Sequence, residues 1–243
     1  MKNFDPKLTF NEANAEVYDS LAVLGDEAET VELLSSLANG GTALELAVGT
    51  GRIALPLAER GVRVDGIDFS EPMVAKLRAK PGGDKLSITL GDFVDVDVPG
   101  MYSPVYVVFN SFFNVLSQDD QVRCFENVAK HMNDDGVFLI EAFVPTSLGL
   151  DGDQYVHAEA IEVDTVRLDL LKHDVATQTI QENHVQLSAK GITFNPVVQR
   201  YAWPAELDLM ARIAGLRLHN RWGGWKRQPF TSRSRRHVSV WGR

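Results

Sequence analysis

The chain has 243 residues, a formal net charge of −9 at pH 7, 44% hydrophobic residues and 23% charged residues. This length suffices for one full hydrophobic core with an insertion, and the composition is typical of a soluble globular protein. The negative charge argues against a nucleic-acid partner bound through phosphates, and no apolar run reaches the ~20 residues that a membrane helix needs. The single cysteine, Cys124, has no intrachain disulfide partner. The first residues lack the apolar core of a signal peptide, so we expect a cytoplasmic location.

The first two thirds of the chain alternate between helical and strand patterns. Residues 12–39 predict one or two helices, because Val31, Leu34 and Leu37 recur at helical spacing. Strands and helices then alternate to residue 142, which predicts an α/β fold with a parallel sheet and helices on both faces. The predicted strands are 42–47, 62–67, 86–90, 105–109 and 136–142, and the predicted helices are 53–60 and 119–131.

The pattern changes after residue 142. Three alternating runs, 161–172, 177–188 and 192–201, follow without a helix between them, and this predicts a separate small antiparallel sheet. A helix at 204–214 and two last strands at 216–220 and 237–241 come next. We therefore expect an N-terminal helical cap at 1–39, a core at 40–142 and 200–243, and an inserted β lid at 143–199.

The first predicted strand runs into a turn that contains Gly49 and Gly51. Glycine has no Cβ, so the backbone turns tightly and its N–H groups approach a ligand at a helix N-terminus. Asp68 closes the second strand, where a carboxylate meets ribose hydroxyls in nucleotide sites. The spacing Gly49-x-Gly51-x-x-Ala54 also fits the dinucleotide fingerprint, so the turn alone leaves the cofactor class open.

Glu45 favours one of the two classes. It precedes Gly49 by four residues, where dehydrogenases usually have an apolar residue and methyltransferases have an acid that faces the methionine end of their cofactor. After the third strand, Asp92 and Phe93 offer a carboxylate and a ring where an adenine would lie. The chain also lacks the Tyr-x-x-x-Lys pair of short-chain dehydrogenases. These features favour S-adenosylmethionine.

With these motifs the chain resembles the class I S-adenosylmethionine-dependent methyltransferases over about residues 40–142 and the C-terminal segment. Residues 45–51 are similar to the first family motif, with Ala47 where the pattern usually has glycine, and residues 64–73 are similar to the second. The resemblance implies a Rossmann-like, seven-stranded, mostly parallel sheet that ends in an antiparallel hairpin. The fourth strand departs from the pattern, because Tyr106 stands where an Asp is favoured.

The resemblance also implies roles for individual residues. It puts Asp68 on the ribose hydroxyls, Asp92 on the adenine amino group, and the backbone of Asn110 near the methionine group. Tyr18 would close over the methionine carboxylate, although it could equally anchor its helix. The expected cofactor-binding residues are Tyr18, Glu45, Ala47, Gly49, Gly51, Asp68, Phe69, Met73, Asp92, Phe93 and Asn110.

The inserted sheet leaves the core at the edge where open α/β sheets bind ligands, so we expect it to cover the methyl acceptor. Methyl transfer from a sulfonium requires alignment and exclusion of water, without an enzyme nucleophile. The candidate bases are His157 and Tyr155, with His184 as a further one, and each also fits a structural role. We expect no metal, because no pair of His or carboxylate positions shows ligand spacing on a recognisable scaffold.

The order of elements is similar to that of small-molecule methyltransferases of secondary metabolism, and of deoxyaminosugar N,N-dimethyltransferases in particular. Acidic residues in the insertion suit an amine acceptor, although a solvated surface also explains them: Asp151, Asp153, Glu159 and Glu162. We therefore expect N-methylation of a small-molecule amine, with O-methylation of a phenol or sugar hydroxyl as the alternative.

Two functions outside this class stay open at this point, a nicotinamide-dependent oxidoreductase and a cofactor-binding protein without turnover. The expected partner is a small-molecule acceptor, with no nucleic acid and no membrane. A homodimer through the lid sheet is one association that the arrangement allows.

Overall fold

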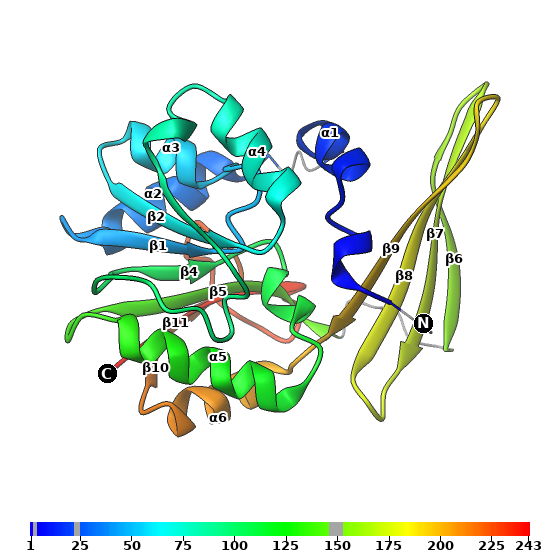
Figure 1. Cartoon of the computed structure of the whole chain (residues 1–243). Coiled ribbons are helices and arrows are strands. Elements are labelled where there is room, and N and C mark those ends of the chain that lie inside the picture. Colours follow the sequence, from blue (N-terminus) through cyan, green and yellow to red (C-terminus); the bar gives the residue numbers. More distant parts are fainter. Residues whose placement is uncertain (2–3, 22–24, 146–152) are drawn as a thin grey trace.

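The structure is a computed structural model that describes residues 1, 4–21, 25–145 and 153–243, so Asp151 lies outside the described residues. It contains a core sheet with helices on both faces and a separate four-stranded sheet beside it (Figure 1). Within the described residues, no helix is both long and apolar enough to cross a membrane.

The core sheet has seven strands in the order β10-β11-β5-β4-β1-β2-β3. The first five strands of the chain are parallel to one another, whereas β11 is antiparallel to β5 and β10 is antiparallel to β11. Their bounds are β1 (Thr42–Leu46), β2 (Arg63–Asp68), β3 (Ser87–Leu90), β4 (Val105–Val107), β5 (Val137–Phe143), β10 (Arg217–Trp222) and β11 (Arg236–Gly242). The predicted mostly parallel sheet with its C-terminal hairpin is confirmed.

Helices cover both faces of this sheet (Figure 1). One core cluster contains Phe125 and Leu207 of the helices below the sheet, and the other contains Leu34 and Leu57 of the helices above it. The helices are α1 (Glu12–Leu21), α2 (Glu27–Ala38), α3 (Ala54–Glu59), α4 (Glu71–Ala79), α5 (Gln118–His131) and α6 (Pro204–Ile213), with short 3₁₀ turns η1 (Pro6–Leu8), η2 (Gly83–Lys85) and η3 (Ser111–Asn114). The start of α4 is fixed by Ser70, whose hydroxyl accepts a hydrogen bond from the Met73 N–H.

The separate sheet has four strands rather than the three that the sequence predicts. It runs β6-β7-β8-β9 with every pair antiparallel. The bounds are β6 (Gln154–Ile161), β7 (Thr165–Asp174), β8 (Thr179–Ser188) and β9 (Gly191–Arg200). The first predicted run, 161–172, corresponds to β7 but begins too early, because it includes the last residue of β6 and the turn between the two strands. β6 has strand-forming residues at its two ends, Tyr155 with Val156 and Ile161, but the residues between them are His, Ala and Glu, and pairing with β7 makes the whole segment a strand.

One face of this sheet, here called the inner face, looks toward the N-terminal segment and the core. It carries Asn195 and Gln199 of β9 and the residues paired with them across the strands. The Asn195 side chain accepts a hydrogen bond from Asn14 of α1 at 2.7 Å, and the Gln199 side chain donates one to Asn114 of η3 at 3.3 Å. The N-terminal segment therefore lies between the two sheets, as Figure 1 shows.

The turn after β1 begins with an unusual backbone conformation. Ala47 has a φ of 57°, in the left-handed region, where a residue with a Cβ pays about 1–2 kcal/mol of strain. The turn is held by the Val48 N–H, which donates to the Ile67 carbonyl of β2 at 3.0 Å. The backbone of Ala47 is thus strained, whereas glycine at this position would adopt the same conformation without strain.

We expect Ala47→Gly to raise the free energy of unfolding by about 0.5 kcal/mol. The relief of left-handed strain exceeds the ~0.5–1 kcal/mol that the extra freedom of glycine in the unfolded chain costs. The matched control is Ala75→Gly on the exposed side of α4, which should lower the free energy of unfolding by about 1 kcal/mol. Urea unfolding of the two variants checks this, and an equal loss in both would refute the strain at Ala47.

Candidate functional site

Asp68, at the carboxyl end of β2, joins two turns. One carboxylate oxygen accepts the Gly49 N–H at 2.7 Å, and the other accepts the Ser70 N–H at 2.8 Å. The side chain is buried, and this burial raises the pKa of the Asp68 carboxyl against the opposing effect of these hydrogen bonds. Each oxygen has a further lone pair, so the carboxylate can still accept the two hydroxyls of a ribose.

Both glycines of the turn adopt left-handed conformations, with φ of 55° at Gly49 and 80° at Gly51. A Cβ at Gly51 would lie 3.0 Å from Leu55 and Leu77, so packing as well as conformation requires glycine there. A Cβ at Gly49 would meet Met73 at an ordinary 3.5 Å, so at this position the backbone conformation alone requires glycine. Gly51 shapes the turn, and Gly49 presents its N–H to Asp68.

A pocket of about 370 Å³ opens beside this turn, at the ends of β2 and β3. Its walls include three predicted adenine contacts, Phe69, Asp92 and Phe93. The Phe10 ring meets the Phe69 ring edge to face, with centroids 5.8 Å apart, so the N-terminal segment forms part of the rim. A space of this size and mixed polarity fits a purine ring.

A second hollow, of about 30 Å³, lies on the other side of Gly49 under α1. It is lined by Tyr18, Glu45, Ala47, Val48, Gly49, Thr50, Arg52, Ile53, Val108, Phe109 and Ser111. It holds little more than a water molecule. α1 closes it through Asp19, which accepts a hydrogen bond from Thr50 at 2.6 Å and pairs with Lys80 at 2.7 Å. A ligand as large as an amino acid enters this hollow only when α1 moves.

Glu45 and Tyr106 form a fully buried pair at the bottom of this hollow. The Tyr106 hydroxyl donates to a Glu45 carboxylate oxygen at 3.0 Å. Burial raises the pKa of Glu45 to about 8, although the Tyr106 hydrogen bond and the charge of Arg52 oppose the shift. The departure of the fourth strand from the family pattern therefore has a physical role, because Tyr106 supplies the donor that the buried acid needs.

Three polar groups of Asn110 make hydrogen bonds within the protein. Its N–H donates to the Glu141 carbonyl at 3.3 Å, its carbonyl accepts the Phe113 N–H at 2.9 Å, and its side-chain oxygen accepts the Phe143 N–H at 2.7 Å. These contacts join the ends of β4 and β5. Its predicted contact with the methionine group stays a prediction, and the neighbours Phe109 and Ser111 are the residues that line the hollow.

Arg52 is a candidate residue that the sequence reasoning missed. It directly follows the glycine turn and lines the small hollow. Its guanidinium pairs with Glu27 of α2 at 3.0 Å and lies 5.2 Å from the centre of the Phe109 ring. The signal was its position next to Gly51, which makes it the first side chain that can reach back over the turn.

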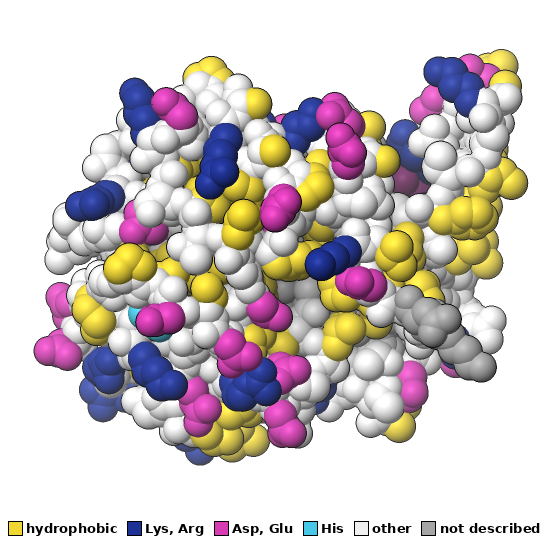
Figure 2. Space-filling view, viewed as in Figure 1, with side chains coloured by type: hydrophobic (Ala, Val, Ile, Leu, Met, Phe, Trp, Pro, Cys, Tyr) yellow, Lys and Arg dark blue, Asp and Glu magenta, His cyan; other side chains and the backbone are white. Residues whose placement is uncertain are grey.

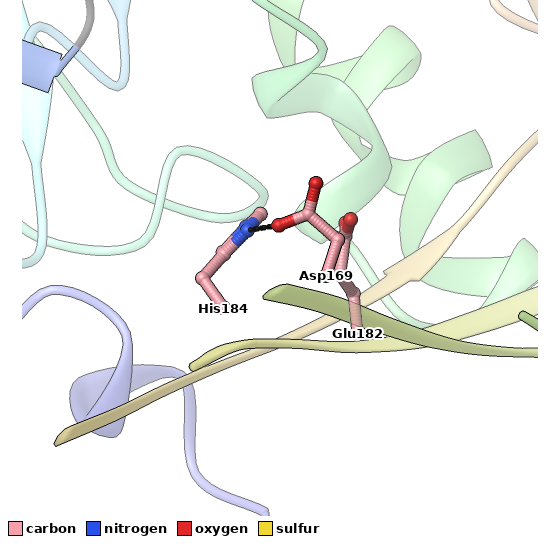
Figure 3. Close-up of side chains that lie close together, drawn as sticks. All are labelled: Asp169, Glu182 and His184. Atoms are coloured by element: carbon pink, nitrogen blue, oxygen red, sulfur yellow. Dashed lines mark hydrogen bonds and ion pairs between the residues drawn. The ribbon is translucent and has the colours of Figure 1, made fainter. Parts of the chain in front are cut away.

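On the inner face of the separate sheet, Asp169, Glu182 and His184 point toward one another (Figure 3). Nδ1 of His184 lies 2.7 Å from an Asp169 oxygen, and one ligand atom from each of the three residues lies within 4.8 Å of the others. Burial raises the pKa of Glu182, and the neighbouring His184 opposes this shift. Within the described ranges, these three residues also form the one set of side chains that could hold a metal ion.

The cluster occupies a defined place relative to the core. His184 is paired in register with Asn195, the residue that Asn14 of α1 contacts. The cluster therefore faces the N-terminal segment. It lies on the same face of the sheet as Gln199, which contacts η3.

His157 and Tyr155 lie on β6, the strand of this sheet that is farthest from the core (Figure 1). His157 is opposite Asp169 in the register, so it shares the inner face with the cluster, and its side chain is exposed. Tyr155 is opposite Leu171, which is opposite Glu182. The structure thus brings both candidate bases beside the cluster and away from the residues at the ends of β1, β2 and β3.

The buried acid gives a prediction about stability and pH. Because the pKa of Glu45 is raised from 4.5 to about 8, the folded protein keeps a proton that the unfolded chain releases. This contribution to stability is fully present below pH 4.5 and is lost as the pH rises through about 8. Glu45→Gln, which is neutral at every pH, should therefore match the parent at about pH 4 and be more stable by on the order of 2–4 kcal/mol at about pH 9.

Urea unfolding at several pH values measures this difference. Glu59→Gln, on the exposed end of α3, is the control for loss of a surface carboxylate. Parallel stability curves for the parent and Glu45→Gln would show that Glu45 folds in its charged form.

The comparison with known proteins agrees with this geometry. Residues 43–136, which span the glycine turn, Asp68 and Asp92, match the family described as "Methyltransferase domain". The structure superimposes on the CcbJ methyltransferase from Streptomyces caelestis with a TM-score of 0.92 and 37% sequence identity, over 98% of this chain and 99% of that one.

Two further relatives are similar over nearly their whole length. The chain is 29% identical to the cypemycin N-terminal methyltransferase of a Streptomyces species, over 97% of this chain and 98% of that protein. The fold is also that of CalS10 of Micromonospora echinaspora, an amino pentose methyltransferase solved with its methyl donor, at a TM-score of 0.70, 17% identity and 99% coverage of both chains. The chain belongs to the class I S-adenosylmethionine-dependent methyltransferases, and the cofactor that the glycine turn left undecided is S-adenosylmethionine.

Proposed function

We propose that the enzyme N-methylates a small-molecule amine held between the inner face of the separate sheet and the cofactor site. The observation that carries this proposal is the cluster of Asp169, Glu182 and His184, which faces the gap beside α1. In this proposal residues 143–199 form the acceptor lid, residues 1–39 the cap over the cofactor, and residues 40–142 with 200–243 the cofactor-binding core.

The cluster has the chemistry that an amine acceptor requires. A free aliphatic amine carries a positive charge near neutral pH, and two carboxylates attract it. The amine must also lose a proton before its nitrogen can react, and imidazole is the usual acceptor of protons in this pH range. His184, held by Asp169 at 2.7 Å, is placed to take that proton.

The cofactor-binding residues would hold the methyl donor in line with the acceptor. Asp68 would hold the ribose, the pocket of Phe69, Asp92 and Phe93 the adenine, and the hollow beside Glu45 and Tyr18 the methionine group. S-adenosylmethionine provides a methyl group on sulfur, whose C–S bond breaks as the acceptor forms its new bond to that carbon. α1, which must open to admit the cofactor, then excludes water from the site.

The names of similar proteins support nitrogen as the acceptor atom. The cypemycin enzyme is named for an N-terminus and CalS10 for an amino pentose, and both name an amine. A phenol or sugar hydroxyl would need a base but would gain little from two nearby carboxylates, so O-methylation is the second candidate.

The first test concerns the cofactor. Asp68→Asn removes the charge that would accept two ribose hydroxyls, so the affinity for S-adenosylmethionine should fall by at least ~1.5–3 kcal/mol, about 10- to 150-fold. Isothermal titration calorimetry measures the loss. Asp84→Asn, on the short η2 turn, is the control and should bind as the parent does. Unchanged affinity in a folded Asp68→Asn protein would show that this carboxylate does not bind the ribose.

The second test concerns the acceptor. A panel of amines and hydroxyl compounds with labelled S-adenosylmethionine identifies which class is methylated. For the best amine, the double change Asp169→Asn and His184→Gln should lower kcat/KM at least about 100-fold, the lower range for loss of a general base. The affinity for S-adenosylmethionine should stay within about twofold of the parent, because the cluster lies outside the cofactor pockets.

Gln186→Ala is the matched control, since Gln186 is the next residue along β8 on the same face. It should retain the parent's kcat/KM. Addition of a chelator to the parent should leave the rate unchanged, because an amine rather than a metal ion would occupy the cluster. Transfer to hydroxyl compounds alone, or full activity in the double variant, would overturn the proposal.

A further inference from the structure

Arg167 is the one lysine or arginine on the inner face of the separate sheet, whose four strands lie wholly within the described residues. It precedes Asp169 by two positions on β7, so both side chains lie on the same face. Its Nε donates a hydrogen bond to Glu159 at 3.2 Å. Its terminal nitrogens, Nη1 and Nη2, make no hydrogen bond with any described residue. The fork of the guanidinium is therefore free to bind a ligand.

This fork lies on a part of the sheet that ligands can reach. The start of β7 pairs with the end of β8, at the end of the sheet opposite the point where β9 joins the core (Figure 1). Figure 2 shows a notch between this end of the sheet and the rest of the molecule, with basic and acidic side chains at its border. The Arg167 side chain is 36% exposed. The acidic side chains of α1 that pair with α4 on the core are two: Glu16 with Lys76 and Asp19 with Lys80.

We infer that the methyl acceptor is a zwitterion whose carboxylate binds Arg167 while its amine binds at the cluster beside Asp169. This inference rests on the proposed function. A guanidinium fork donates two parallel hydrogen bonds to a carboxylate, which makes arginine selective for planar acidic groups. Residues two positions apart on a strand are separated by about 7 Å. The amine and the carboxylate of the acceptor would therefore be several bonds apart rather than on one carbon.

The charges around Arg167 favour a carboxylate over other groups. Glu159, Asp169 and Glu182 already bring carboxyl groups to this face, so the second negative charge of a phosphate would increase the repulsion. An acceptor with a second amine in place of the carboxylate would meet the positive guanidinium. Arg167 thus selects for an amino acid and against a diamine, through one attractive and one repulsive contact.

The test compares acceptors that differ only in the carboxylate, namely δ-aminovalerate and its amide. The parent should favour the acid about tenfold in kcat/KM, as expected for hydrogen bonds to a charged group at a partly exposed site. Arg167→Met should raise KM for the acid about tenfold and leave kcat unchanged, because the lost contact binds ground state and transition state alike. Values for the amide should not change. Lys190→Met, which removes an exposed cation from the turn after β8, is the matched control and should behave as the parent does.

Charge reversal gives a second readout that a purely structural role of Arg167 would not produce. Arg167→Glu should methylate cadaverine, which has an amine in place of the carboxylate, more efficiently than δ-aminovalerate. The parent should show the opposite preference. Circular dichroism shows whether the variants fold. A folded Arg167→Glu protein that keeps the preference of the parent would overturn the inference.

A binding measurement separates this inference from the proposed function. Calorimetry with the protein loaded with S-adenosylhomocysteine measures the affinity for the acid and for the amide without turnover. Selective binding of the acid that Arg167→Met abolishes, without methylation of any amine, would support the carboxylate site and refute the proposed function. Equal kcat/KM for acid and amide in the parent would overturn the inference and leave the proposed function intact. Binding of neither compound would also overturn the inference.

Discussion

The bonds that Asp68 makes with the backbone hold the cofactor site together. One carboxylate reaches the Gly49 N–H in the turn after β1 and the Ser70 N–H at the start of α4, so two turns from different β-α units share one anchor. The first turn presents its amide to this buried carboxylate with a left-handed backbone at Gly49, a conformation that favours glycine. The adenine pocket, the start of α4 and the turn over Glu45 all take their positions from this arrangement.

Much of the core could be predicted because its signals are local. Alternating strands and helices fix a parallel sheet, and the glycine spacing with Asp68 and Asp92 points to the carboxyl ends of three strands. The bond from Tyr106 to Glu45 could not be predicted, since it joins two strands that become neighbours only when β4 pairs with β1. Arg52 was missed for a similar reason, because its contacts with Glu27 and Phe109 depend on how helices and strand ends pack.

In the insertion, the strand pattern predicts less than it does in the core. Alternation predicts two faces of different polarity, but it does not tell which face meets the core. In this sheet the polar face turns inward, toward α1 and η3, because Asn14 and Asn114 offer it hydrogen bonds. The same alternation then leaves the apolar face outside. The sequence pattern also did not predict β6, which pairs with β7. This strand lies at the edge of the sheet and carries His157 and Tyr155.

The position of β11 has a consequence for how the chain folds. β5 ends before the separate sheet begins, yet its neighbour β11 consists of residues 236–242, so almost a hundred residues separate the two strands in the chain. During synthesis the parallel strands and the helices at their faces emerge first, and β5 remains an unpaired edge of buried apolar residues throughout that time. The hairpins of β6 to β9 form locally in the interval, since each strand pairs with the next in sequence. The seven-residue strand β11 therefore completes the core sheet, and a chain that lacks this strand leaves the edge of β5 open to pairing with another chain.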